Sequence, residues 1–175
     1  MVRNILSRNP HSMTNVKQHE PAADTQLNSI IKNLPKPEGT KYPYDLVTIE
    51  GHTAYVAGQI PKKDSGLAYV GAVGTGISVR DAVDAARICA QQAMSWLHHS
   101  AGGLENLNRL LRVTCYVAHD DTFQDISAVA DGASNCLIGA LGAKGRHTRS
   151  VIGVKSLPRN APVLIEVTAA LKRPV

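Results

Sequence analysis

The sequence predicts an α+β fold in which two helices cover one face of a mixed sheet of about six strands. Three observations support this prediction. The chain has 175 residues, enough for one domain with its own core. Hydrophobic residues make up 43% of it, as in ordinary globular proteins. Segments of strand and helix periodicity follow one another in the order β-β-β-α-β-α-β-β. We expect a single domain over residues 38–175.

The first 37 residues are polar and interrupted by prolines, which indicates a tail rather than part of the core. One short helical candidate, Thr25–Asn33, lies within it. The segment is too polar for a signal peptide, and no apolar run approaches the ~18–20 residues that a membrane helix needs. We therefore expect a partly flexible tail on a cytoplasmic protein that does not enter the membrane.

The first half of the domain begins with a hairpin pattern. Asp45–Glu50 and Thr53–Ile60 have strand patterning and are separated by Gly51 and His52. A short strand is expected near Leu67–Val70. The glycine-rich Gly71–Gly76 that follows lacks the Lys-Ser/Thr of a phosphate-binding loop and the spacing of a dinucleotide fingerprint, so it predicts a turn.

A long amphipathic helix comes next. Ser78 is a suitable N-cap, an apolar stripe runs from Val79 to Leu97 at helical spacing, and Gly102 ends the segment. His98 and His99 fall in the last turn, where a cation suits the helix dipole, so we interpret them as helix-end residues rather than metal ligands.

The second half alternates strand, helix and two strands. Leu107–His119 contains a strand, and Asp120 or Asp121 is the expected N-cap of the second helix. Two strands close the chain, Ser150–Ser156 and Val163–Leu171. No element remains to cover the other face of the sheet. We expect that face to be apolar and to drive self-association.

Composition argues against several classes of protein. The pI of 9.2 suggests nucleic-acid binding, but residues 1–37 carry +3 of the net charge of +5, and one Trp and one Phe offer few stacking platforms. Three widely spaced cysteines form no CxxC or zinc spacing, so we expect reduced core thiols. We expect neither a metal nor a cofactor.

Two ordered motifs carry a family resemblance. They are AYVAGQIP at Ala54–Pro61 and TRSVIGVKSLP at Thr148–Pro158. They resemble the RidA/YjgF family of reactive-intermediate (imine/enamine) deaminases, over roughly residues 39–172. Two further stretches, VGTGISVRDAVDAARICAQQ and ADGASNCLIGALGAKGRHTRS, are closer to a longer-chain branch labelled endoribonuclease L-PSP or chorismate-mutase-like. The resemblance implies a chorismate-mutase-like fold and a cofactor-free homotrimer with sites at its subunit interfaces.

Arg149, at the head of an apolar strand, is the central candidate residue. Strand alternation sorts the side chains into Arg149, Val151 and Gly153, expected at a subunit interface, and Ser150, Ile152 and Val154, expected under the helices. The resemblance implies that Arg149 holds a substrate carboxylate, which a guanidinium grips through two hydrogen bonds, with the Val151 N–H as a further donor. The residues alone equally allow an ion pair between subunits, with Asp131 as the partner.

The resemblance implies three further features of the site. An aromatic side chain covers it, for which Tyr42 and Tyr44 are candidates unless they pack the tail onto the domain. A Glu that orients water is expected where this chain has Leu164. Glu166, two residues further on the same strand face, is the catalytic substitute, or an interfacial ion-pair partner. Asp131 stands near the position of a frequent Asn, where it either weakens the carboxylate site or replaces the base.

The leading hypothesis is therefore a hydrolase of the RidA type, which deaminates an imine or enamine whose carboxylate Arg149 holds. Leu164 favours an alternative, a non-enzymatic metabolite-binding protein of the same fold. An endoribonuclease is a further alternative, supported by the label on the longer-chain branch. Chorismate mutase chemistry, with Arg146 and Arg149 as cationic grips, rests mainly on fold analogy.

Overall fold

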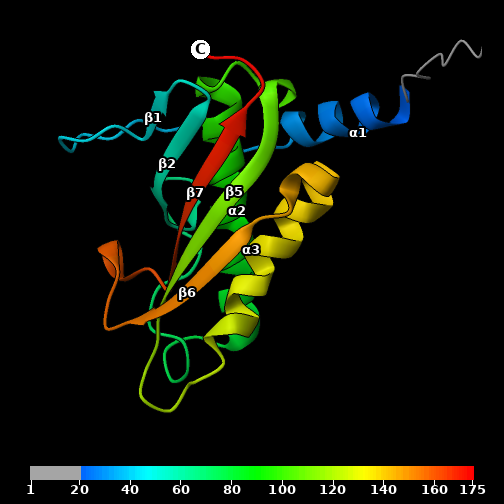
Figure 1. Cartoon of the computed structure of the whole chain (residues 1–175). Coiled ribbons are helices and arrows are strands. Elements are labelled where there is room, and N and C mark those ends of the chain that lie inside the picture. Colours follow the sequence, from blue (N-terminus) through cyan, green and yellow to red (C-terminus); the bar gives the residue numbers. More distant parts are fainter. Residues whose placement is uncertain (1–20) are drawn as a thin grey trace, which may run out of the picture.

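The computed structural model describes residues 21–175 and has two layers, a sheet and a pair of helices on one of its faces (Figure 1). The sheet has five strands in the order β1-β2-β7-β5-β6. Their bounds are β1 Val47–Glu50, β2 Thr53–Gln59, β5 Leu107–Ala118, β6 Thr148–Val154 and β7 Val163–Leu171. β5 and β6 run parallel, and the other neighbours are antiparallel. The predicted two-layer α+β fold is confirmed.

The expected sixth strand lies outside this sheet. β3 (Lys62–Lys63) and β4 (Gly66–Leu67) pair only with each other, in a short hairpin. Pro61 follows the end of β2 and has no amide N–H to extend that strand, and the chain reverses at Asp64 with a φ of 52°. Of the strand expected near Leu67–Val70, only Leu67 lies in a strand, and that strand belongs to this hairpin rather than to the main sheet.

Helix α2 (Val79–Ser100) matches its predicted start. The Ser78 Oγ accepts a hydrogen bond of 3.1 Å from the Asp81 N–H, which satisfies one of the free donors of the first turn. Its buried face is rich in alanine and continues through Met94 to Leu97. These small side chains let α2 lie close to both the sheet and α3.

Helix α3 (Ile126–Leu141) begins later than the sequence predicted, because the residue expected to cap it is engaged elsewhere. The Asp120 carboxylate accepts hydrogen bonds from the Thr75 N–H (2.5 Å), the Thr122 N–H (2.9 Å) and the Thr122 hydroxyl (2.6 Å). These bonds tie two loops together. The N-cap is Asp125, which accepts from the Ala128 N–H at 3.2 Å.

Packing of α3 on α2 depends on Gly132. A Cβ at this position would overlap the carbonyl group of Val83, so only glycine allows the two backbones to approach this closely. The 20 residues Ile126–Gly145, with a mean hydropathy of 1.2, are long and apolar enough by themselves to span a membrane, contrary to our expectation from the sequence. In this fold they form α3, which packs against α2, and the short turn that follows it.

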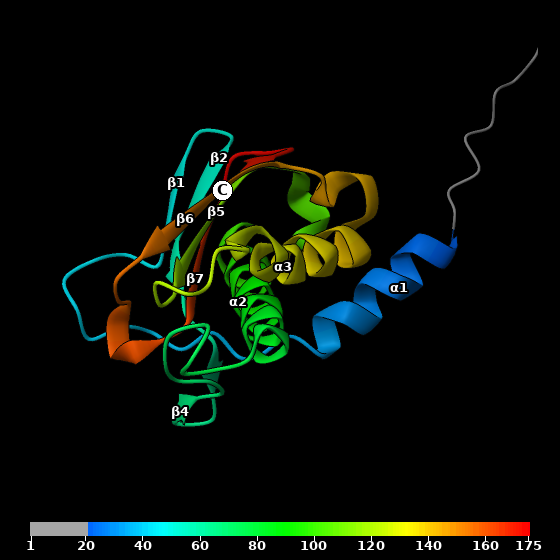
Figure 2. The same cartoon turned by 90° about the horizontal axis from the view of Figure 1, so that it is seen from below.

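Helix α1 (Pro21–Lys32) starts four residues before the segment predicted from the sequence. It lies beside α3, on the helix side of the molecule (Figure 2). Leu27, Ile31 and Leu34 pack against the core, and the Ser95 hydroxyl donates a hydrogen bond to the Pro35 carbonyl. The flexibility expected for the start of the tail concerns residues 1–20, which lie outside the described residues.

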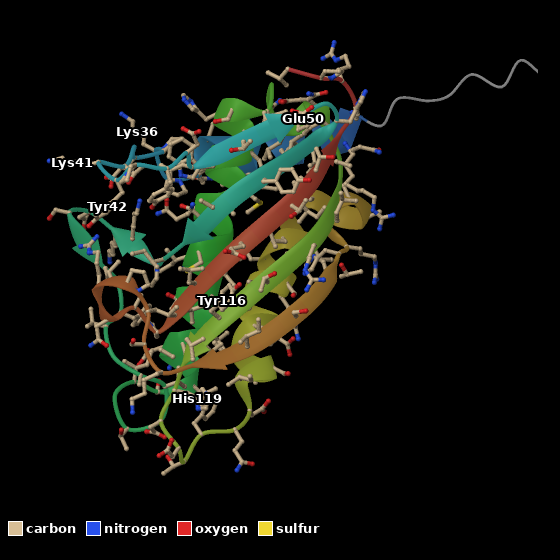
Figure 3. The ribbon with its side chains drawn as sticks, turned by 60° about the vertical axis from the view of Figure 1, so that its left-hand side comes forward. Lys36, Lys41, Tyr42, Glu50, Tyr116 and His119 are labelled. Carbon is tan, nitrogen blue, oxygen red and sulfur yellow. The ribbon has the colours of Figure 1, made fainter. Side chains whose placement is uncertain are left out.

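The face of the sheet away from the helices is more polar than the sequence led us to expect. Figure 3 views this face, with Tyr116 near its middle. Tyr55 and Ile152 are exposed hydrophobic side chains on it. Among them lie polar and charged residues: Thr48, Glu50, Arg112, Thr114, Ser150, Glu166 and Thr168. A partner on this face would meet mixed chemistry rather than an apolar surface.

The two glycines of α3 provide a test of the helix contact. Gly132→Ala should lower the free energy of unfolding by about 1–3 kcal/mol because it overpacks the contact with α2. Gly139→Ala is the matched control: a Cβ there meets no atom within 4 Å, so it should raise stability by about 0.5–1 kcal/mol through helix propensity. Urea unfolding measures both, and an equal effect of the two substitutions would contradict the proposed contact.

Asp120 should make stability depend on pH. The Thr122 hydroxyl first, and then the Thr75 N–H, hold the pKa of Asp120 well below its ordinary value of 3.8. The ionised carboxylate therefore stabilises the fold above that ordinary value, and its contribution is lost as pH falls towards the pKa of the folded state. Asp120→Ala should lower the melting temperature at pH 7, with a smaller difference at pH 3. A difference independent of pH would contradict this account.

Candidate functional site

The side chains of β6 face the opposite way from the sequence-based expectation. In the parallel pairing, Arg149 lies beside Val113 and Val151 beside Cys115. Val113 and Cys115 are fully buried under the helices, and residues paired in register point to the same face of a sheet. Arg149 and Val151 therefore lie on the helix side. Ser150, Ile152 and Val154 lie on the open face, where Ile152 is 41% exposed.

Arg149 lies at the edge of the sheet next to α3. Its Nη1 donates to the Asp131 Oδ1 at 2.7 Å and to the Ser134 Oγ at 3.0 Å. The Arg149 side chain is 23% exposed and that of Asp131 is 59% exposed. Among residues 21–175, no partner accepts a hydrogen bond from its Nε or Nη2. The ion pair thus forms within one chain and uses a single nitrogen of the guanidinium, leaving the Nε/Nη2 edge for another acceptor.

Ser134 and His147 complete this cluster, and our reading of the sequence gave them no role. The His147 Nε2 lies 3.1 Å from the Ser134 Oγ, and its Nδ1 lies 2.6 Å from the Gly145 carbonyl oxygen. Spacing could have indicated both. Ser134 is one helical turn after Asp131, so the two side chains share a helix face. His147 precedes Arg149 by two residues, the spacing of side chains that share one face of a strand.

Glu166 is not in this cluster. Thr114 pairs with Ser150 on one side and Glu166 on the other, so Glu166 lies on the open face, opposite to Arg149. The Tyr116 hydroxyl donates to its Oε2 at 3.3 Å. Desolvation first, and then the Glu166 carboxylate, raise the pKa of Tyr116 above its ordinary value. Within one chain, Arg149 and Glu166 cannot act on the same small molecule.

Leu164, at the position expected for Glu, also lies on the open face. It pairs with Tyr116 across the β5–β7 ladder. A Cβ at Gly58, on the neighbouring strand β2, would overlap the Leu164 side chain. The glycine of the AYVAGQIP motif therefore leaves room for an apolar side chain here.

Tyr42 and Tyr44 precede β1, at the edge of the sheet opposite to β6. Figure 3 shows Tyr42 in the loop beyond the β1 side of the sheet, near Lys41. The two rings stack with centroids 6.3 Å apart, and the side chains are 72% and 51% exposed. Three strands separate β1 from β6, so the structure does not bring either tyrosine to Arg149 within one chain.

Gly153, expected at a subunit interface, lies against the His119 ring of the same chain. A Cβ there would overlap the His119 ring, whose Nδ1 lies 2.8 Å from the Asp120 carbonyl oxygen. His119 also meets Phe123 edge-on, with centroids 6.4 Å apart. Figure 3 shows His119 at the end of the sheet far from Glu50. We interpret Gly153 and His119 as a packing pair.

The three cysteines are buried or partly buried free thiols. Burial raises the pKa of Cys89 and Cys136, and raises that of Cys115 to about 12, so all three thiols are protonated near neutral pH. Within the described part of the chain, no three His, Cys, Asp or Glu side chains are placed to hold a metal ion together. The polar cluster on the helix side of β6 is built from Asp131, Ser134, His147 and Arg149.

This fold is shared with known proteins. Residues 24–171 match the family described as YjgF/chorismate mutase-like, putative endoribonuclease. The chain belongs to this family, which confirms the resemblance drawn from the two sequence motifs.

Three relatives place the chain more closely. Protein TCP17 of Trypanosoma cruzi is 33% identical over 129 residues, which are 73% of this chain and 81% of TCP17. The protein Atu1372 of Agrobacterium tumefaciens, of unknown function, is 30% identical with a TM-score of 0.78, over 86% of this chain and 95% of Atu1372. TdcF of Escherichia coli, solved with bound serine, shares the fold at a TM-score of 0.56 and 21% identity, over 77% of this chain and 93% of TdcF.

Proposed function

We propose that this protein is a cytoplasmic hydrolase of the RidA type. It binds a small carboxylate-bearing imine or enamine and hydrolyses it to a carbonyl compound and ammonia. Arg149 holds the carboxylate, and the site lies between copies of the chain in a homotrimer. Family membership and the serine bound to TdcF support a small-molecule ligand with a carboxylate.

The free edge of the Arg149 guanidinium carries this proposal. A carboxylate prefers two parallel hydrogen bonds from a planar fork, and the Nε/Nη2 edge provides them. Asp131 and Ser134 fix the plane of the guanidinium through Nη1 alone. The ion pair within the chain therefore orients the guanidinium and leaves its Nε/Nη2 edge free to bind a carboxylate. The Val151 N–H, two residues along the edge strand, is the proposed additional donor.

The positions of the other candidate residues favour a site between copies. Arg149 lies on one edge strand, and Tyr42 and Tyr44 lead into the other. Placing the edge of one copy against the opposite edge of the next brings an aromatic wall to the arginine. Glu166, on the open face, would reach a substrate held by Arg149 only from a neighbouring copy.

A non-enzymatic binding protein is the second candidate, and Leu164 favours it. An apolar side chain stands where the family resemblance implies the carboxylate that orients water, and it is packed over Gly58. In that case a small carboxylate raises the melting temperature, by an amount that grows with the logarithm of its concentration above Kd, without turnover.

A coupled assay tests the hydrolase. An amino-acid oxidase generates imines from several amino acids, and semicarbazide traps whatever the protein leaves unhydrolysed. We expect wild type to reduce trapping. Arg149→Ala should lose about 10–150-fold in kcat/KM, the value of one or two hydrogen bonds to a charged group, and Arg149→Lys should recover only part because it has no fork.

The controls separate binding from folding. The Arg149 side chain is only 23% exposed, so Arg149→Ala should lower the unfolding temperature somewhat, and thermal unfolding of each variant measures that loss of stability separately from the loss of activity. Glu166→Gln and Leu164→Glu test the open face. A loss of imine hydrolysis in Glu166→Gln would show that Glu166 orients the hydrolytic water. No activity in wild type but a gain in Leu164→Glu would show a binding pocket whose hydrolysis has been lost. Full activity in Arg149→Ala would overturn the proposal.

Mixed oligomers test the site between copies. A protomer carrying Tyr42→Ala and Tyr44→Ala lacks one half of the proposed site, and an Arg149→Ala protomer lacks the other. If one copy contributes each half, refolding the two inactive variants together should restore part of the activity, because some interfaces then contain both intact halves. Refolding either variant alone is the control. Mixtures no more active than their components would place the complete site within one chain.

A further inference from the structure

The cluster around Arg149 contains a serine and a histidine arranged for proton transfer. We propose that His147, acting through the hydroxyl of Ser134, accepts and returns the proton of the hydrolytic water at this site. The inference rests on the proposed hydrolase function and adds to it the acid–base group that Leu164 does not supply.

The bonds of His147 determine which of its nitrogens is basic. A carbonyl oxygen only accepts hydrogen bonds, so the contact of 2.6 Å with the Gly145 oxygen places a proton on Nδ1. In the neutral ring the lone pair is then on Nε2, which faces the Ser134 Oγ at 3.1 Å. A backbone carbonyl thus holds the ring in the tautomer that accepts from the serine, the same orienting role that a third group has in nucleophile–base pairs.

The bonds of Ser134 connect this base to the substrate grip. The hydroxyl donates its proton to His147, and its oxygen accepts from the Arg149 Nη1 at 3.0 Å. One lone pair of the oxygen stays free. A substrate carboxylate on the Nε/Nη2 edge would lie on the same guanidinium, so its imine carbon and an attacking water fall close to Ser134. The guanidinium beside the oxygen also stabilises negative charge that develops there.

The other carboxylates are less well placed for this role. Glu166 lies on the opposite face of the sheet, bound by the Tyr116 hydroxyl. Asp131 is near, but its Oδ1 is bound to Arg149 at 2.7 Å, where it orients the guanidinium. His147 faces the cluster with its Nε2 lone pair directed at the Ser134 hydroxyl, so it is placed to take the serine proton.

The proposed reaction needs no oxidant, metal or cofactor. The water oxygen forms a bond to the imine carbon while its proton passes to the Ser134 Oγ and the serine proton passes to His147 Nε2. The C=N electron pair moves to nitrogen, which takes that proton back from His147 through Ser134, so the addition gives a neutral carbinolamine beside a neutral imidazole. In a second pass of the relay, the carbinolamine hydroxyl proton moves to His147 and from there to the nitrogen, the C–N bond breaks, and ammonia leaves as the carbonyl forms.

Two substitutions at His147 distinguish proton transfer from a structural role. His147→Gln retains an acceptor for the Ser134 hydroxyl but takes up no proton, and His147→Ala removes both properties. In the coupled imine assay we expect both variants to lose about 10²–10⁴-fold in kcat, as for general acid–base catalysis, with KM unchanged because Arg149 still binds the carboxylate. Ser134→Ala should lose a similar factor. Ser127→Ala, an exposed serine on the same helix, is the matched control and should match wild type.

Each outcome bears on one proposal or the other. Loss of kcat in His147→Gln, with wild-type thermal unfolding and partial rescue of His147→Ala by added imidazole, supports the relay. Retained kcat in His147→Gln would overturn it and leave the hydrolase proposal standing, since only the hydrogen bond would then matter. A wild-type protein that hydrolyses no imine overturns the hydrolase proposal and the relay with it.

Discussion

The parallel pairing of β6 with β5 is the constraint on which the site depends. It sets Arg149 beside Val113, on the side of the sheet that the helices cover, although β6 is an edge strand. At an interior strand this position would bury the guanidinium. At the edge the side chain stays partly exposed while α3 supplies Asp131 and Ser134 to orient it. An edge position under a helix combines a fixed charge with access for a ligand.

The two faces of the sheet consequently carry different chemistry. The helix side of β6 holds a cation, an anion, a hydroxyl and an imidazole in one connected set of hydrogen bonds. The open face carries the Tyr116–Glu166 pair, an Arg112–Ser150 hydrogen bond of 2.7 Å, and Leu164 above Gly58. Family resemblance by itself would merge these residues into a single site. The strand register separates them and assigns them to different surfaces of the protomer.

Much of the fold could be predicted because local signals determine it. The Ser78 cap, the helical stripe of α2 and the alternation in β7 each depend on neighbours in sequence, and each was predicted correctly.

The prediction of which β6 side chains face the helices was wrong. An edge strand with partly exposed residues on both sides has no clear apolar alternation, so only its pairing with β5 decides which side chains face the helices. The cap of α3 was wrong because the partner of Asp120, Thr75, is 45 residues away. Ser134 and His147 were missed because common polar residues signal a role only once two elements are brought together.

The close contact between α2 and α3 has a consequence for how this protein tolerates change. Gly132 touches the backbone of Val83 and is followed in the same helix by Ser134 and preceded by Asp131. The distance of α3 from α2 is therefore set by backbone contact, which does not adjust as side-chain packing does. A substitution in the core of α2 that changes the size of a side chain would displace α3. Because Asp131 and Ser134 both lie on α3, such a displacement would move both partners of Arg149. The residues buried between α2 and α3 should therefore tolerate fewer substitutions than equally buried residues elsewhere in the core.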